Sequence, residues 1–225
     1  MAIDLHAVVV EADEPVRLAR FWADLLEAEA SNIGGEESVA VQLEDGVVLE
    51  FVPATQSKEG KNRLHLDLAS ESEGHQTTLV EAACRLGGAL ADIGQDSVPW
   101  VVLADPEGNE FCVLEPRDEY RGCGPVAAVV TDTHDPVAVA RFLSDNLGFP
   151  MTRAHPDYAS LRRDGGSWLE FVRNPHRPQR QGRLHLQFAA QSPPPGQAAT
   201  DCPVCPHQAT AASDPESTLF CISPG

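Results

Sequence analysis

The chain has 225 residues, of which 42% are hydrophobic, so it is long enough for one large domain or two small ones with packed cores. Its formal net charge of −18 argues against nucleic-acid and membrane partners, because phosphate backbones and anionic lipids repel an acidic surface. No apolar run reaches the roughly 20 residues of a membrane span, and residues 1–6 lack the features of a secretory signal, so a cytoplasmic location is expected.

The predicted elements of the first half alternate between strands and helices. The apolar run 5–10 predicts a strand, and Asp13 followed by Pro15 predicts the cap and first turn of a helix that ends at Leu26. A second helix is predicted over 77–86, where Gly87 follows. The remaining strands are expected at 28–32, 39–43, 47–52, 64–68, 91–94, 98–103 and 110–114. This order gives two βαβββ modules and an α+β architecture.

The second half repeats the first. Four blocks return in the same order: 14–21 as 135–142, 49–52 as 169–172, 63–66 as 183–186, and 105–112 as 214–221. Between the last two blocks the second copy is shorter by about eleven residues, which removes much of its second helix. We expect a first domain at 1–118, a linker at 119–124 and a diverged, shortened second domain at 125–225.

Several blocks carry a family resemblance. They are Ala19-Arg20-Phe21-Trp22, Leu49-Glu50-Phe51-Val52, Arg63-Leu64-His65-Leu66-Asp67-Leu68 and Asp105-Pro106-Glu107-Gly108-Asn109 with its flanking strands. Together they resemble the vicinal oxygen chelate superfamily, which includes glyoxalases, bleomycin-resistance proteins and dioxygenases, and most closely its glyoxalase-like branch. The resemblance spans nearly all of 5–117 and more loosely 125–225. It implies tandem domains in which two βαβββ modules pair to form a cupped mixed sheet.

The resemblance also implies a metal site in the cup of the first domain. The superfamily takes its ligands from the first and last strands of each module, and those positions here are His6, Glu50, His65 and Cys112. Cys112 departs from the pattern, because glyoxalase I enzymes have a carboxylate there. Imidazole, carboxylate and thiolate groups suit Zn²⁺, and the first two also suit Ni, Fe or Mn. No organic cofactor is implied.

The residues themselves partly support this site. In the strand 64–68 the leucines share one face, which leaves His65 and Asp67 on the other. Glu50 lies between apolar neighbours, where a carboxylate is costly unless it is paired or metal-bound. Glu50 and Asp67 are therefore the candidate catalytic groups. The simpler alternatives are a metal-free hydrogen bond between His65 and Glu50, Cys112 as a small hydrophobe, and Asp67 as a solvated strand end.

The second copy has lost part of this set. Ala127 stands where His6 would be, and Gln187 stands where Asp67 would be. The counterparts of the other three positions are Glu170, His185 and Cys221. We therefore expect one candidate site, in the first copy, and a diverged partner that completes or covers it.

One cysteine motif has no counterpart in the first copy. Cys202, Cys205 and His207 have spacing that is compatible with structural zinc, and Cys221 is a candidate fourth ligand. Against zinc, the chain has a single C-x-x-C motif, and the proline-rich run 193–196 before it is typical of a linker. In a cytoplasmic protein the six cysteines are not expected to form a disulfide scaffold.

Three functions remain open at this point. The first is a metal-dependent lyase or isomerase whose cation accepts two substrate oxygens in the cup. The second is a metal-free protein that binds or sequesters a small molecule, and the third is a scaffold without small-molecule chemistry. The expected assembly is either a monomer whose two copies pair internally or a homodimer.

Overall fold

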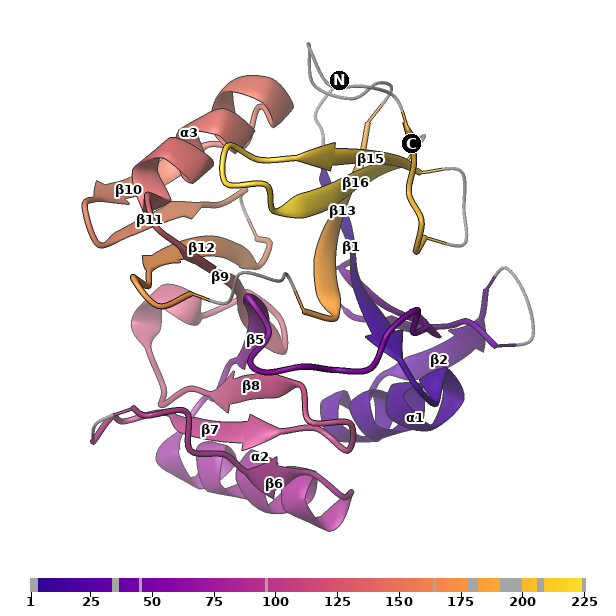
Figure 1. Cartoon of the computed structure of the whole chain (residues 1–225). Helices are drawn as coiled ribbons and strands as arrows, with labels where there is room; N and C mark the ends of the chain where they lie inside the picture. The colour runs from indigo at the N-terminus through magenta and orange to yellow at the C-terminus, as the bar shows by residue number, and fades with distance from the viewer. Residues whose placement is uncertain are drawn as a thin grey trace.

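The computed structural model describes residues 4–33, 37–44, 46–95, 97–163, 165–177, 182–190, 200–205 and 209–223 (Figure 1). The first copy contains β1 (Asp4–Ala12), α1 (Pro15–Leu26), β2 (Glu29–Asn32), β3 (Val39–Gln42), β4 (Val48–Pro53), β5 (Leu64–Leu68), α2 (Glu73–Arg85), β6 (Ala89–Leu90), β7 (Val101–Ala104) and β8 (Glu110–Val113). After η1 (Asp118–Tyr120), the second contains β9 (Val126–Thr133), α3 (Pro136–Leu147), β10 (Met151–His155), β11 (Tyr158–Leu161), β12 (Trp168–Arg173), β13 (Leu184–Ala189), β14 (Thr200–Asp201), β15 (Thr210–Ser213) and β16 (Leu219–Ser223).

The strands form two mixed eight-stranded sheets. Sheet A has the order β14-β15-β16-β13-β1-β4-β3-β2, and sheet B has the order β10-β11-β12-β9-β5-β8-β7-β6. The α+β class and the tandem organisation are therefore confirmed. Each sheet, however, joins one module of the first copy to one module of the second. The cup that we expected within the first copy is thus shared between the copies, because β1 pairs with β13 and β5 pairs with β9.

The main core lies on the helix side of both sheets. Alternating residues of the central strands supply it, for example Val8 and Val10 of β1 and Leu64 and Leu66 of β5. All the buried residues of α1 and α3 except the first proline of each helix belong to the same cluster, so the helices cover this side. The opposite faces of the sheets carry smaller, separate clusters of buried residues. Those faces are where polar side chains gather.

Two helix starts differ from the expectation. Glu14, not Asp13, is the N-cap residue of α1, and Asp13 instead forms an ion pair with Arg183. Helix α2 begins at Glu73, four residues earlier than expected, because the Ser72 hydroxyl accepts the His75 N–H at 3.1 Å and caps the helix there. The counterpart of α2 would fall in residues 191–199, which lie outside the described residues, so the expected loss of much of that helix stays a prediction. None of the helices in the described ranges is long and apolar enough to cross a membrane.

Candidate functional site

Each sheet places a glutamate and a histidine from different copies in one row of its helix-free face. In sheet A, Val9 of β1 lies opposite Glu50 of β4 on one side and His185 of β13 on the other. We call this face A. In sheet B, Val130 of β9 lies in the same way between Glu170 of β12 and His65 of β5, and we call this face B. The two rows are related by the internal repeat.

This arrangement divides the four positions that the sequence suggested as metal ligands. His6 and Glu50 belong to sheet A, whereas His65 and Cys112 belong to sheet B. His6 lies in a bulge of β1 and is exposed. The structure therefore brings His65 and Cys112 together but does not unite them with His6 and Glu50. The physical reason is that β1 pairs with β13 and β5 pairs with β9. The two modules of the first copy therefore lie in different sheets, and a set of four ligands needs residues from both copies.

On face B, three side chains form a compact group. Asp67 lies next to Cys112 on the neighbouring strand, and one ligand atom from each of His65, Asp67 and Cys112 lies within 4.8 Å of the others. The His65 Nε2 and Asp67 Oδ1 atoms are 3.5 Å apart. His65 Nδ1 and Asp67 Oδ1 are buried and have no hydrogen-bond partner among the described residues. The same holds for the indole Nε1 of Trp168, which is on this face.

Burial dominates the electrostatics of this group. It lowers the pKa of His65 to about 4, with a further contribution from the charge of Lys61. It raises the pKa of Asp67 to about 7, although a hydrogen bond with Cys112 acts in the opposite direction. Burial also raises the pKa of the Cys112 thiol, and the Asp67 charge adds to that effect. Near neutral pH the group therefore contains a neutral imidazole, a protonated thiol and a carboxyl that can hold or release a proton.

An open pocket of about 620 Å³ adjoins this end of face B. Its lining includes Arg117, Tyr120, Arg153, Tyr158, Ser160 and Glu170. The Tyr120 hydroxyl donates a hydrogen bond to Glu170 Oε1 at 3.3 Å, and burial raises the pKa of Glu170. Tyr120 belongs to the segment that was expected to act only as a linker. The pocket therefore combines basic, acidic and aromatic groups, nearly all of them from the second copy and the segment that joins the copies.

Face A carries a different polar group, formed by His185, Cys202, Cys205 and Cys221. Cys202 and Cys205 are the C-x-x-C motif, and Cys221 is the fourth residue that the sequence suggested. His207 lies outside the described residues, and the histidine of this group is His185 of β13. Hydrogen bonds from the Cys205 and Cys221 thiols hold the pKa of Cys202 well below its ordinary value. Glu50 is close enough for its charge to raise the pKa of Cys205.

The duplication of a two-module unit is also what the comparison with protein families finds. The family model described as a glyoxalase-like domain matches residues 7–114 and again residues 128–223. The chain belongs to this glyoxalase-like domain family. Membership of the vicinal oxygen chelate superfamily, expected from the sequence blocks, is thereby confirmed. Among curated proteins, none matches the chain.

Solved structures resemble this chain over nearly its whole length. Glyoxalase I from Zea mays is 15% identical with a TM-score of 0.68, over 99% of this chain and 92% of that one. A putative dioxygenase from Bacillus subtilis is 14% identical with a TM-score of 0.64, over 98% of this chain and 84% of that one. At such identities the likeness establishes the fold and says nothing about the substrate.

Two features of the site were not found from the sequence of this glyoxalase-like protein. The first is Tyr120, because a tyrosine in a turn-rich segment gives no signal of its own. The second is the partnership of His185 with the C-x-x-C motif. The repeat does contain that signal: His185 and Cys221 are the counterparts of His65 and Cys112, so two candidate ligands that are neighbours in the first copy could have predicted the same neighbours in the second.

Proposed function

We propose that this protein binds a small polar molecule on face B, in the pocket that the second copy forms with the segment joining the two copies. The supporting observation is that three buried polar atoms on face B, His65 Nδ1, Asp67 Oδ1 and Trp168 Nε1, have no hydrogen-bond partner among the described residues. They share this face with Glu170, which lines the pocket. An unmade buried hydrogen bond costs about 1–3 kcal/mol, so three on one face favour a bound group that completes them. They include one fixed donor, one carboxylate acceptor and one imidazole nitrogen.

The pocket lining indicates the class of ligand. Arg117 and Arg153 supply positive charge, with Arg117 paired to Glu115 at 2.6 Å, and Glu170 and the Tyr120 hydroxyl add hydrogen-bonding groups to the lining. Arg153 forms an ion pair with Glu119, with Nη2 and Oε2 2.5 Å apart, and its guanidinium carbon lies 4.7 Å from the centre of the Trp168 ring. A ligand with an anionic or enol-type oxygen and a planar apolar part fits this combination, since the arginines attract the oxygen and the aromatic rings contact the remainder.

A metal-dependent lyase or isomerase is the second candidate, and one observation favours it. Two ligands on a tetrahedral ion lie roughly 3.3–3.8 Å apart, and the His65 Nε2 to Asp67 Oδ1 separation is 3.5 Å. His65, Asp67 and Cys112 would hold the ion, and Zn, Ni, Fe or Mn would then be the candidates. When bound, such an ion supplies Lewis-acid stabilisation of negative charge on a substrate oxygen. Glu170, across the row from His65, is placed to hold or move a proton at its Oε1.

The two candidates are separated by one series of binding measurements. A library of small carboxylic acids, phenols and enols is screened by ligand-observed NMR against metal-free protein and against protein incubated with each cation. Metal-free binding predicts hits that are retained in chelator and that weaken at least about tenfold in Asp67→Asn and in Tyr120→Phe, because one hydrogen bond to a charged group contributes about 1.5–3 kcal/mol. Metal-dependent binding predicts hits only with a cation, and the loss of that cation in His65→Ala and Cys112→Ser.

The controls for this series are changes of the same chemistry at exposed positions. Cys84→Ser and Asp24→Asn alter exposed side chains of helices α2 and α1, which pack on the other side of the sheets from face B. We expect both to bind like the unchanged protein. A ligand whose affinity is equal in Asp67→Asn, Tyr120→Phe and the two controls binds elsewhere and would contradict the proposal.

A further inference from the structure

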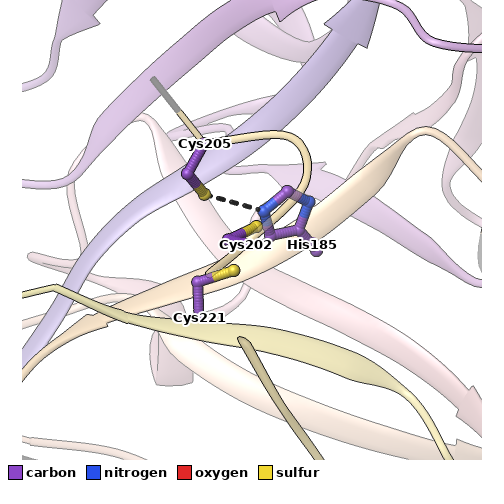
Figure 2. A group of neighbouring side chains, drawn as sticks. All are labelled: His185, Cys202, Cys205 and Cys221. Carbon is purple, nitrogen blue, oxygen red and sulfur yellow. Dashed lines mark hydrogen bonds between the residues drawn. The ribbon is translucent and has the colours of Figure 1, made fainter. Parts of the chain in front are cut away.

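Four potential metal ligands converge at the part of sheet A that the second copy provides. His185 lies on β13 and Cys221 on the neighbouring strand β16, while Cys202 and Cys205 come from the turn that follows β14. One ligand atom from each lies within 4.8 Å of all the others. Figure 2 shows the three sulfur atoms and the imidazole ring pointing toward one another, with His185 Nε2 and Cys205 Sγ 3.2 Å apart.

The group is enclosed by the protein. Cys221 is fully buried, His185 is 2% exposed and Cys202 is also buried, whereas Cys205 is partly exposed. Apolar side chains, among them Ala209, pack around the sulfurs. All six cysteines are free thiols, so no disulfide accounts for the proximity of these three. A buried cysteine ordinarily behaves as a small hydrophobe, and three of them beside one imidazole nitrogen need a different explanation.

We propose that His185, Cys202, Cys205 and Cys221 bind one structural Zn²⁺ ion. Three thiolates and one imidazole are a common ligand set for structural zinc, with Zn–S and Zn–N distances of about 2.3 and 2.0–2.1 Å. Ligand atoms on such an ion lie roughly 3.3–3.8 Å apart, so the present separations require only small movements of side chains. All four positions of the tetrahedron come from the protein. The ion therefore has no open position for a substrate, and its role is to hold the chain together.

The place of the cluster in the fold explains why a zinc ion is useful there. In the first copy, helix α2 packs beside β6 and β8 and covers the corresponding module. The second copy is about eleven residues shorter than the first in this region, so less chain is available to cover its module. A small module with a reduced core needs another source of stability, and a metal ion supplies it directly. The zinc links the β14–β15 hairpin to β13 and β16, and it does not depend on ligand binding at face B.

Two readouts on the unmodified full chain test the proposal. The protein is produced without a metal-affinity tag, dialysed against a weak chelator and analysed for metal and for reactive thiols. We expect about one Zn²⁺ per chain, and we expect three of the six thiols to react with a thiol reagent only when zinc is removed. Because the ligands bind as thiolates, adding Zn²⁺ back to metal-free protein should release protons. These readouts need no substitution, so they remain valid if a variant fails to fold.

Substitutions then assign the ion to this cluster. Cys202→Ser and Cys205→Ser should each weaken zinc binding by about 100-fold or more, since even the loss of a group that only supports a ligand costs 10–100-fold. Cys84→Ser, at an exposed cysteine of α2, is the matched control and should retain the ion. Co²⁺ should give the intense thiolate charge-transfer absorption of a tetrahedral site in the control and lose most of it in the other two.

Three results would overturn the proposal. The first is freshly prepared, reduced protein that neither contains zinc nor retains added zinc through dialysis. The second is zinc that persists in Cys202→Ser and Cys205→Ser at the level of Cys84→Ser. The third is a Cys202–Cys205 disulfide in protein isolated under reducing conditions, because the motif would then be a redox pair. Loss of ligand binding at face B in His65→Ala with unchanged zinc would leave the inference standing.

Discussion

Arg183 of the second copy forms an ion pair with Asp13 of the first, with Nη2 and Oδ1 2.8 Å apart, and its Nη1 lies 3.0 Å from Glu107 Oε2. Glu107 also accepts the backbone N–H groups of Asp13 and Glu14 at 2.7 and 2.8 Å. The repeat produces a related contact on the other side, where Arg63 donates to the Thr218 hydroxyl at 2.8 Å. Each copy thus places a buried arginine against the other copy. Arg183 contacts the residues before α1 and the turn between β7 and β8, and Arg63 contacts the turn between β15 and β16.

The first prediction concerns this contact. Arg183→Met should lower the free energy of unfolding by about 2–3 kcal/mol, because hydrogen bonds to charged groups contribute about 1.5–3 kcal/mol and the partly buried Glu107 carboxylate loses its cation. Urea denaturation measures the effect. Arg17→Met is the control, since Arg17 pairs with Glu14 on the open surface and should leave the midpoint unchanged. Equal midpoints for the two variants would contradict the importance of the buried contact.

The second prediction concerns the close approach of the copies at Gly182. The Gly182 φ angle is +84°, and a Cβ atom added there would lie 2.8 Å from the Asn62 Cα atom. Asn62 Oδ1 also accepts the neighbouring Arg183 N–H at 2.9 Å, so Asn62 cannot move away without losing that bond. Gly182→Ala should therefore lower the thermal unfolding midpoint by several degrees, as expected for a loss of about 2 kcal/mol in a chain of this size.

A matched glycine separates the clash from backbone strain. Gly165 has a φ angle of +78° and no atom within 4 Å of an added Cβ, so Gly165→Ala measures the strain alone. We expect its midpoint to fall by about 2–4 °C, which corresponds to about 1 kcal/mol. If Gly182→Ala and Gly165→Ala lose the same stability, the contact between Gly182 and Asn62 does not constrain the join between the copies.

The third prediction concerns the dependence of each copy on the other. A fragment of residues 1–118 lacks β13, which pairs with β1, and β9, which pairs with β5. Its two central strands would then have exposed hydrogen-bonding edges, which favour association. We expect the fragment to be a dimer or an aggregate by light scattering, and co-expression with residues 125–225 to restore a one-to-one complex. A folded, monomeric fragment with native-like circular dichroism would show that the copies are independent.

The fourth prediction concerns pH and Glu170. Burial raises the pKa of this carboxyl above its ordinary value of 4.5, so the folded state holds the proton more tightly than the unfolded chain does. Ionisation of Glu170 therefore reduces stability, and this loss is absent below about pH 4.5 and grows as pH rises through the folded-state pKa. Glu170→Gln should then be more stable relative to the unchanged protein at pH 8 than at pH 4, as measured by urea denaturation at each pH. Glu44→Gln, at an exposed turn, should show no such change, and an equal difference at both pH values for Glu170→Gln would refute the prediction.

Much of the local structure was readable from the sequence. The alternation of β5 predicted that His65 and Asp67 share a face opposite the leucines, and the four repeated blocks predicted two copies of one α+β unit. The C-x-x-C motif together with Cys221 indicated three members of the sulfur cluster. These features depend on neighbours within a few residues, so side-chain periodicity and residue type are enough to specify them.

The pairing of the modules was decided only by the tertiary structure. Both copies carry the same pattern along their first strands, so β1 offers a similar edge to β5 of its own copy and to β13 of the other. The long-range contacts of Arg183 and Arg63, with the approach of Gly182 to Asn62, favour the exchange between copies. That exchange moved Glu50 away from His65, placed Glu50 in one row with His185 and made face B a joint product of both halves. Local sequence determined which side chains lie on the helix-free face of a sheet. The competition between equivalent strand edges determined which of those side chains lie on the same face.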